Sequence, residues 1–347
     1  MPEVGSSFGA PPLLLPTRDL VLLGDSTLDN VLWVDEPRAS QCVAGLLRAQ
    51  LKGTPTQVHN LAVDGFTSSD VLEGGQAVLS SQERRVHGDP LPIDTTRGPH
   101  FCAPLEALAA LPNAKDAIVV LSVGGNDIRH KLGDPGGIMA AIHQLQTELY
   151  PRLLKRILAI TPRVVIVMQY RPCIKHEFTA AYGVYQNIDA LPIPGAATPL
   201  RKLEVVLEQV YAPILRLAAE HKLAVVDLPR SMDPHDMSLY KLQIEPSGRG
   251  GSLISRLVLH AAAHHGDRPS TLYYTPCTPK SRGGEAPAVV RAEVNAFSPA
   301  SPWLVAGEGG VEDAQPAALV GGAGASAAAG GGGGGGAASA TPPAAPN

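Results

Sequence analysis

The chain has 347 residues, 44% of them hydrophobic and 17% charged, so it is long enough to bury a sizeable core. Its net charge is −4, and its 28 lysine and arginine residues form no basic stripe interleaved with aromatics, which argues against a nucleic-acid partner. The 36 glycines and 32 prolines indicate that much of the length lies outside regular elements. We therefore expect one domain with irregular additions.

Five apolar runs recur along the chain, and a polar or glycine-containing turn and a helical pattern follow each of them. This alternation predicts a parallel sheet covered by helices on both faces. The runs are Leu20–Leu23, Val58–Ala62, Ala117–Val123, Val164–Met168 and Leu223–Leu228. Apolar residues at helical spacing predict covering helices over 38–51, 138–160, 199–221 and 251–265, with a kink or boundary at Pro151.

Composition divides the chain into four parts. The predicted globular domain covers 18–265, and residues 77–98, with several charges and two prolines, are expected to form a surface insertion. Residues 309–347, rich in glycine and alanine, cannot bury enough apolar area to offset the entropy of ordering, so a disordered tail is predicted. The other two parts are a flexible leader at 1–17 and, at 266–308, an extension partly packed on the domain, with a last extended segment at Thr271–Pro276.

The sequence lacks the motifs of several kinds of binding site and of secretion or membrane insertion. The four cysteines are far apart and form no C-x-x-C pair, so neither a zinc site nor a dense disulfide framework is predicted. No phosphate loop, dinucleotide fingerprint or metal cluster is present, and we expect no cofactor. The N-terminus lacks a basic leader with a long apolar core, and no run approaches the ~18 apolar residues of a membrane span. We expect a soluble, intracellular protein without an integral membrane segment.

The first apolar run leads directly into Gly24-Asp25-Ser26. A serine at such a turn stands at the carboxyl edge of the sheet, and we expect its hydroxyl to be held at a helix N-terminus. There, backbone N–H groups and the helix dipole favour a developing negative charge. Ser26 is therefore either a nucleophile or the cap of a helix.

Two further strand ends carry residues that suit an oxyanion site. Gly65 follows the second run, and a glycine there lets the backbone approach a ligand, although it is equally a plain turn residue. The third run ends in Gly124-Gly125-Asn126-Asp127. The Asn126 amide is a donor that can face an oxyanion without taking its proton, whereas Asp127 is expected to tie down its own turn by accepting backbone N–H bonds.

With serine, glycine and asparagine at three strand ends in chain order, residues 18–265 resemble the SGNH hydrolases, the GDSL-type esterase and lipase family. Gly24-Asp25-Ser26 is similar to the first block of that family, Gly65 to the second, and Gly124-x-Asn126-Asp127 to the third. The resemblance implies a flavodoxin-like three-layer α/β/α sandwich with about five parallel strands. It also implies a Ser26 nucleophile, with Gly65 and Asn126 completing the oxyanion hole.

The last block departs from the family pattern. The family has D-x-x-H-P, with the histidine as base and the aspartate orienting it, but Glu245 and Leu242 stand at those two positions here. One hypothesis makes Glu245 the base, which requires burial to raise its pKa from about 4.3. A second assigns the base to another histidine, best His235, whose acidic neighbours could orient an imidazole. In the third, the domain keeps the fold and hydrolyses little or nothing.

We therefore expect a serine esterase that cleaves a small-molecule carboxylic ester through an acyl-enzyme on Ser26. The alternative is a catalytically impaired domain that binds an acylated or sugar-like ligand. Arg171, just after the fourth run, is either a binding group for an anionic substrate or a solvated loop charge, and the second reading is favoured.

Overall fold

The computed structural model describes residues 15, 19–76, 93–94, 100–174, 183–265, 270–277 and 289–294. The chain divides into two units, 1–307 and 308–347, and every described residue belongs to the first. The predicted leader (except Leu15), the predicted insertion at 77–98 (except 93–94) and the predicted tail at 309–347 lie outside the described residues. Those assignments stay predictions.

A seven-stranded sheet forms the centre of the domain, in the order β12-β11-β8-β7-β6-β1-β2. All neighbours are parallel except β11 and β12. The five predicted strands are confirmed, the predicted extended segment adds a sixth parallel strand, and the antiparallel edge strand was not predicted. The strands are β1 (Asp19–Gly24), β2 (Gln57–Asn60), β6 (Ile118–Ser122), β7 (Val164–Val167), β8 (Ala224–Val226), β11 (Thr271–Tyr274) and β12 (Val290–Glu293).

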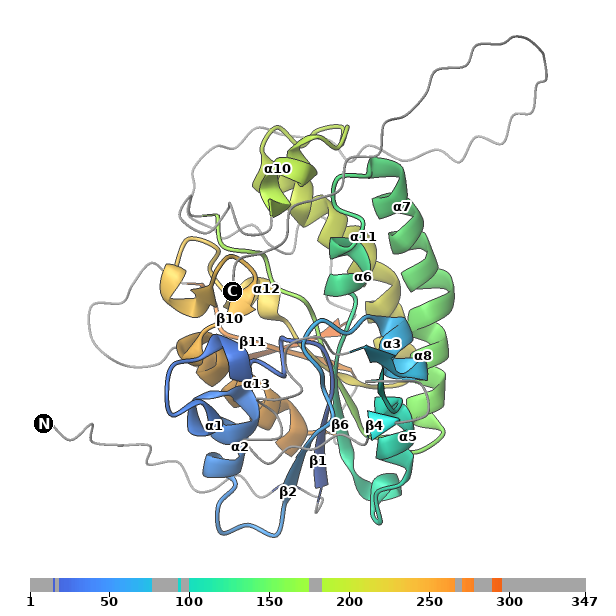
Figure 1. The fold of residues 1–347 in the computed structure, drawn as a ribbon, viewed down its shortest axis with the longest axis vertical. Coiled ribbons are helices and arrows are strands. Elements are labelled where there is room, and N and C mark those ends of the chain that lie inside the picture. The colour runs from blue at the N-terminus through green and yellow to red at the C-terminus, as the bar shows by residue number, and fades with distance from the viewer. Residues whose placement is uncertain are drawn as a thin grey trace, which may run out of the picture. The chain divides into compact units, whose positions relative to one another are not determined.

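Helices cover both faces of this sheet (Figure 1). Because successive side chains of a strand point to opposite faces, Val21 and Leu23 enter one hydrophobic core, and Leu20 and Leu22 enter the other. The fold is thus the expected three-layer α/β/α sandwich. The first core is covered by α3 (Ser68–Glu73), α5 (Pro104–Ala109), α7 (Pro135–Gln144), α8 (Tyr150–Leu158) and α11 (Pro199–Glu220), and the second by α2 (Val43–Gln50) and α13 (Gly248–Ala263).

Two predicted helices are interrupted. The 38–51 segment splits into α1 (Arg38–Gln41) and α2, because Cys42 between them adopts an extended conformation with φ −74° and ψ 162°. The 138–160 segment passes from α7 through a π-helical turn at Leu145–Leu149 into α8, where Pro151 occupies the first turn. Since proline has no N–H to donate inside a helix, the hydrogen-bond ladder is offset just before it.

Short elements surround the carboxyl edge of the sheet, where β6 leads upward into α6 in Figure 1. They are α6 (Gly125–Arg129), α10 (Val184–Asp189), α12 (Leu228–Ser231), the hairpin of β9 (Tyr240–Lys241) and β10 (Glu245–Pro246), and 3-10 helices at Val31–Trp33 and Met237–Leu239. A further 3-10 helix, Ala114–Asp116, precedes β6. A separate small sheet pairs β3 (Gly75–Gln76), β5 (His100–Phe101) and β4 (Ile93–Asp94).

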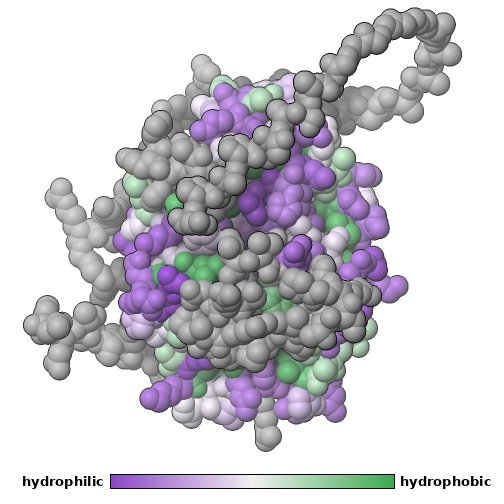
Figure 2. All heavy atoms as spheres, viewed as in Figure 1, coloured by the Kyte–Doolittle hydropathy of each residue, from purple (hydrophilic) through white to green (hydrophobic). Residues whose placement is uncertain are grey.

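On the face seen in Figure 2, the described atoms that are visible are largely hydrophilic, with small hydrophobic areas near the middle. Within the described ranges, no helix combines the length and the apolar character that crossing a bilayer requires.

Candidate active site

Ser26 lies in a tight turn directly after β1. Gly24 has φ 140°, and a Cβ at this position would lie 1.8 Å from the carbonyl oxygen of Ser122, so only glycine fits. The N–H groups of Leu28 and Asp29 both donate to the Asp25 carbonyl, at 3.1 and 3.0 Å, and the turn ends there. The expectation that Ser26 stands at a helix N-terminus is therefore wrong.

Long-range hydrogen bonds explain why no helix follows. The Asp29 carboxylate accepts from the Asn60 amide at 3.1 Å and from the Asp64 N–H at 3.0 Å. The Asn30 side chain accepts from the Val43 N–H at 2.8 Å. These bonds draw the chain away from the helical path and fix the Ser26 turn to the ends of neighbouring segments.

A buried polar network lies beneath Ser26. Asp25 accepts hydrogen bonds from the Thr27 N–H at 3.1 Å, the Ser122 hydroxyl at 3.2 Å and the Gln169 amide at 2.7 Å. Burial raises the pKa of Asp25 to about 7, although the bonds from Thr27 and Ser122 lower it. The network joins the carboxyl ends of β1, β6 and β7, and so holds the Ser26 turn at the centre of the sheet edge.

Gly65 occupies a turn beside this centre. The Phe66 N–H donates to the Val63 carbonyl at 3.1 Å, and Gly65 has φ 84°. A Cβ built on Gly65 meets nothing within 4 Å, so the backbone conformation requires glycine here and crowding does not. The space beside the Gly65 backbone is open.

Asn126 faces the same turn from α6. Its Nδ2 donates to the Phe66 carbonyl at 3.0 Å, and its Oδ1 accepts from Arg129 Nε at 2.8 Å. The second hydrogen of an amide nitrogen can serve another acceptor. The two bonds therefore fix the amide with its oxygen toward Arg129 and its nitrogen toward the segment that carries Gly65.

Asp127 accepts a hydrogen bond from its own backbone N–H, as expected, and also links α6 to a second helix. Its carboxylate accepts from the Ser68 N–H at 3.0 Å and from the Ser68 hydroxyl at 3.2 Å. Burial raises the pKa of Asp127, and the bonds from Ser68 lower it. This contact ties α6, with Asn126, to the N-terminus of α3.

Glu245 approaches Ser26 from the other side, on the β9–β10 hairpin. Its side chain is buried, with 4% of the residue exposed, and it forms a hydrogen bond with the Ser26 side chain. The pKa of Glu245 is raised to about 8. Burial is the largest cause and the charge of Asp64 adds to it, whereas the Ser26 hydrogen bond and the charge of Arg129 act in the opposite direction. Among the described residues, Oε2 of Glu245 has no hydrogen-bond partner.

Backbone contacts hold the hairpin in place. The Asn30 amide donates to the Pro246 carbonyl at 3.1 Å, and the Tyr170 hydroxyl donates to the Ile244 carbonyl. The Cys173 N–H donates to the Gln243 carbonyl at 2.8 Å. Both residues that flank Glu245 are therefore anchored to segments near the sheet edge.

The family's orienting aspartate has no counterpart at its expected position. Leu242 is 41% exposed at the tip of the hairpin and has φ 50°, an unusual backbone conformation for a leucine. The position is thus a hairpin turn, not a partner for Glu245.

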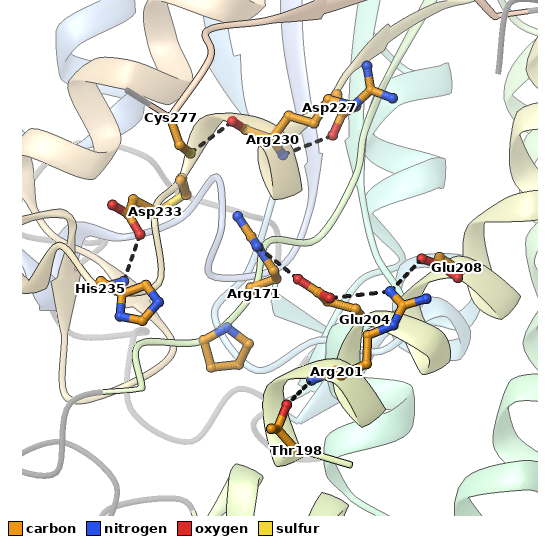
Figure 3. Close-up of polar contacts among 12 residues, drawn as sticks. Arg171, Thr198, Arg201, Glu204, Glu208, Asp227, Arg230, Asp233, His235 and Cys277 are labelled. Carbon is orange, nitrogen blue, oxygen red and sulfur yellow. Dashed lines mark hydrogen bonds and ion pairs between the residues drawn. The ribbon is translucent and has the colours of Figure 1, made fainter. Parts of the chain in front are cut away.

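The contacts found for His235 and Arg171 are with residues other than Ser26 and Glu245. His235 is exposed on the loop after α12, where its N–H donates to Asp233 at 2.9 Å (Figure 3). Arg171 is only 5% exposed and pairs with Glu204 of α11 at 3.0 Å (Figure 3). The reading of Arg171 as a solvated loop charge is therefore wrong. It also lies outside the set of residues that line the adjoining pocket.

A pocket opens beside Ser26. Its walls come from the turn after β1, from α6, α10 and α11, from the segment after β7 and from the residue before β10. The lining residues are Asp25, Ser26, Thr27, Gly125, Asn126, Ile128, Arg129, Leu132, Gln169, Tyr170, Pro172, Val184, Ile188, Leu203, Val206, Leu207 and Ile244. Within the described part of the chain, no group of three or more histidine, cysteine, aspartate or glutamate side chains could hold a metal ion.

Sequence reasoning missed Asn30, Arg129 and Gln169. Arg129 follows Asn126 by three residues, a spacing that puts two side chains on one face of a helix, so this pair was detectable. Gln169 follows the end of β7, the same position relative to a strand that singled out Ser26 and Asn126. Asn30 has no comparable signal, because its partners Val43 and Pro246 are distant in sequence.

Comparisons with known proteins identify a family for this chain. The model of the GDSL-like lipase/acylhydrolase family matches residues 22–252, more than half of the chain. One similar solved structure is phospholipase A1 from Streptomyces albidoflavus NA297, which is 16% identical over 70% of this chain and 98% of that chain, with a TM-score of 0.40. Another is an acetylxylan esterase from Geobacillus stearothermophilus, which is 15% identical over 73% of this chain and 96% of that chain, with a TM-score of 0.41. No curated protein matches. The chain belongs to the GDSL-like lipase/acylhydrolase family of ester hydrolases.

Proposed function

We propose that the protein is a serine esterase that cleaves a carboxylic ester through an acyl-enzyme on Ser26, with Glu245 as the base. The hydrogen bond between Ser26 and the buried Glu245 carboxylate is the observation that carries this proposal. A nucleophile within hydrogen-bond reach of a base is the arrangement that nucleophilic catalysis requires. His235, exposed and bonded through its backbone to Asp233, has no comparable contact with Ser26 among the described residues.

The environment of Glu245 supplies the basicity that an ordinary glutamate lacks. A carboxylate with a pKa of about 4.3 is a weak base toward a serine hydroxyl. Burial raises the pKa of Glu245 to about 8, close to the values that suit general base catalysis near neutral pH. The cost is that most of the Glu245 population is protonated at pH 7 and cannot accept the serine proton.

In the proposed reaction, the ionised Glu245 takes the Ser26 proton as Oγ attacks the ester carbonyl carbon. The carbonyl oxygen becomes an oxyanion, which the Gly65 N–H and the second Asn126 amide hydrogen stabilise. Protonated Glu245 then gives its proton to the departing alkoxide, so an alcohol leaves and an acyl-enzyme remains. A water molecule, deprotonated by Glu245, attacks the acyl carbon, and the proton returns to Ser26 as the acid is released.

Arg129 supports both halves of this site as a positioning residue. Its Nε donates to Asn126 Oδ1 at 2.8 Å, which directs the amide nitrogen away from Arg129. Its positive charge also lowers the pKa of Glu245 and favours the ionised base. One side chain thus orients an oxyanion donor and stabilises the charge of the base.

An active-site label tests the proposal. The native protein is expected to react with a fluorophosphonate probe and to hydrolyse p-nitrophenyl butyrate, whereas Ser26→Ala should do neither. Glu245→Gln keeps the size of the side chain but removes the base, and should lower kcat by about 10²–10⁴-fold. His235→Ala, the matched control, should retain native activity.

Each contrary result has a defined meaning. Loss of activity in His235→Ala together with native activity in Glu245→Gln would move the base to His235. Failure of the native, folded protein to label or to hydrolyse any ester tested would contradict the enzyme proposal. The alternative hypothesis, a catalytically impaired domain that binds an acylated or sugar-like ligand, would then remain.

A further inference from the structure

Helix α13 carries a row of basic side chains. Arg256, His260 and the C-cap residue His264 follow one another at intervals of four residues, which places them along one face of the helix. Nη2 of Arg291, on the edge strand β12, contacts Nε2 of His264. Two elements that are distant in sequence thus bring four basic groups together.

The register of the sheet directs Arg291 toward α13. Arg291 is the cross-strand partner of Tyr273 on β11, and directly opposed residues of paired strands share a face of the sheet. Tyr273 is buried in the second core, which α13 covers. A guanidinium group can only donate, so His264 Nε2 accepts its hydrogen bond. This contact orients Arg291 along the basic face of the helix.

The described residues supply no counter-charge to this cluster. Within the described ranges, neither Arg256 nor Arg291 forms an ion pair with a carboxylate, and neither Arg256 Nε nor His260 Nδ1, both buried atoms, has a hydrogen-bond partner. Burial lowers the pKa of Arg256 and also that of His260. The positive charges that lower the pKa of His260 further come from Arg291, Arg256 and His264. The cluster therefore carries an excess of positive charge.

The helix dipole compensates only part of this charge. The partial negative charge at a helix C-terminus stabilises cations in the last turn, where His260 lies, and at the cap, where His264 lies. Arg256 lies a full turn before His260, and Arg291 belongs to a strand. The two guanidinium charges, which are permanent at neutral pH, thus lack a compensating group in the described part of the chain.

We propose that Arg256, His260 and Arg291 bind a phosphate group, carried by inorganic phosphate, by a soluble phosphate monoester or by a lipid headgroup. Guanidinium forks match the geometry of phosphate oxygens, and hydrogen bonds to an ionised group are the strong ones. The phosphate supplies the counter-charge, the His260 imidazole adds a further donor, and His264 positions Arg291. This site does not depend on the proposed function.

The end of α13 lies at the opposite edge of the sheet from Ser26. His265, just after the helix, contacts the carbonyl of Val164, the first residue of β7, at 3.2 Å. Ser26 follows the last residue of β1, and β1, β6 and β7 are parallel. The phosphate site is therefore separate from the candidate active site.

Calorimetric titration of the full chain at pH 7 tests the site. Inorganic phosphate is expected to bind saturably, with one phosphate per chain, whereas sodium chloride at equal ionic strength should give no saturable signal. Two further arms distinguish the sources of the phosphate group. Glycerol 3-phosphate represents soluble monoesters, and phosphatidylcholine vesicles with and without phosphatidic acid represent lipid headgroups. Tighter binding in one arm than to inorganic phosphate identifies that source.

Charge-removing variants locate the binding. Arg256→Gln and Arg291→Gln should each lower the affinity for phosphate at least about tenfold. Arg256→Lys keeps the charge but not the planar fork, and should also bind more weakly than native. Arg216→Gln, at an exposed position of α11 on the other face of the sheet, makes the same change in net charge and should bind as native. Urea denaturation midpoints check that each variant folds.

The contrary outcomes are equally defined. Absence of saturable binding in all three arms overturns the proposal. Binding that survives the combined Arg256→Gln and Arg291→Gln variant, or that Arg216→Gln weakens as strongly, also overturns it, because the anion would then bind elsewhere. If Arg256→Gln does not fold, the exposed Arg291 decides through Arg291→Gln alone. Labelling of Ser26 is measured separately, so failure of one proposal leaves the other standing.

Discussion

The two sides of the Ser26 hydroxyl are built in different ways. On the oxyanion side, the Gly65 turn and Asn126 are cross-linked to each other and to the sheet through Phe66 and Asp29. On the base side, Glu245 sits on a two-residue strand, held through the backbone carbonyls of its neighbours. The first side depends on backbone geometry and an oriented amide, and the second on a single buried carboxyl group.

This difference shows that the two halves of a hydrolase site need not follow the family pattern equally. Gly24-Asp25-Ser26, Gly65 and Gly124-x-Asn126-Asp127 are similar to the first three blocks of the family. On the base side, Glu245 occupies the position of the histidine, and its pKa is raised, by burial first, to about 8, above the value of about 6.5 that an imidazole has without burial. In the proposed function, the basicity of Glu245 therefore depends on its environment.

The strongest test of the oxyanion side is Asn126→Ala. Removal of one oxyanion donor is expected to lower kcat by about 10²–10³-fold, with little change in KM, because the lost hydrogen bond forms in the transition state. Steady-state kinetics on a p-nitrophenyl ester provide the measurement. Asn113→Ala, at an exposed position remote from the site in sequence, should behave as native. A rise in KM at constant kcat would make Asn126 a ground-state contact instead.

The base side predicts an unusual pH profile. Because the pKa of Glu245 is raised to about 8 and the ionised form is the base, kcat/KM should rise about tenfold from pH 7 to pH 9 and then level off. An imidazole base would level off near its ordinary pKa of about 6.5. A profile flat from pH 7 upward would therefore contradict the role given to Glu245.

A pair of charge variants compares the two sides directly. Arg129→Gln should lower kcat less than tenfold and raise the apparent pKa of the profile, because the charge that favours ionised Glu245 is lost. Asp64→Asn should shift the apparent pKa in the opposite direction. Shifts of the same sign in both variants would show that structural disturbance, and not charge, moves the profile.

Much of this arrangement was accessible from the sequence. Apolar runs predicted the five central strands, and the residues that follow three of them predicted Ser26, Gly65 and Asn126. Glu245 was a candidate only by its position relative to the family pattern, because its raised pKa depends on burial by residues distant in sequence. The pair of Arg171 with Glu204 and the bonds of Asn30 are likewise contacts between distant segments, which periodicity does not reveal.

The buried carboxyl groups of Asp25 and Glu245 also make the free energy of unfolding depend on pH. Their pKa values, about 7 and about 8, lie above their ordinary values, so the folded chain holds protons that the unfolded chain has released. Between about pH 4 and pH 8 these groups therefore lower the free energy of unfolding as the pH rises, an effect that urea denaturation midpoints would measure across the range. If Glu245 is the base, the protein is expected to be most active in the alkaline range, where these two carboxyl groups stabilise its fold least.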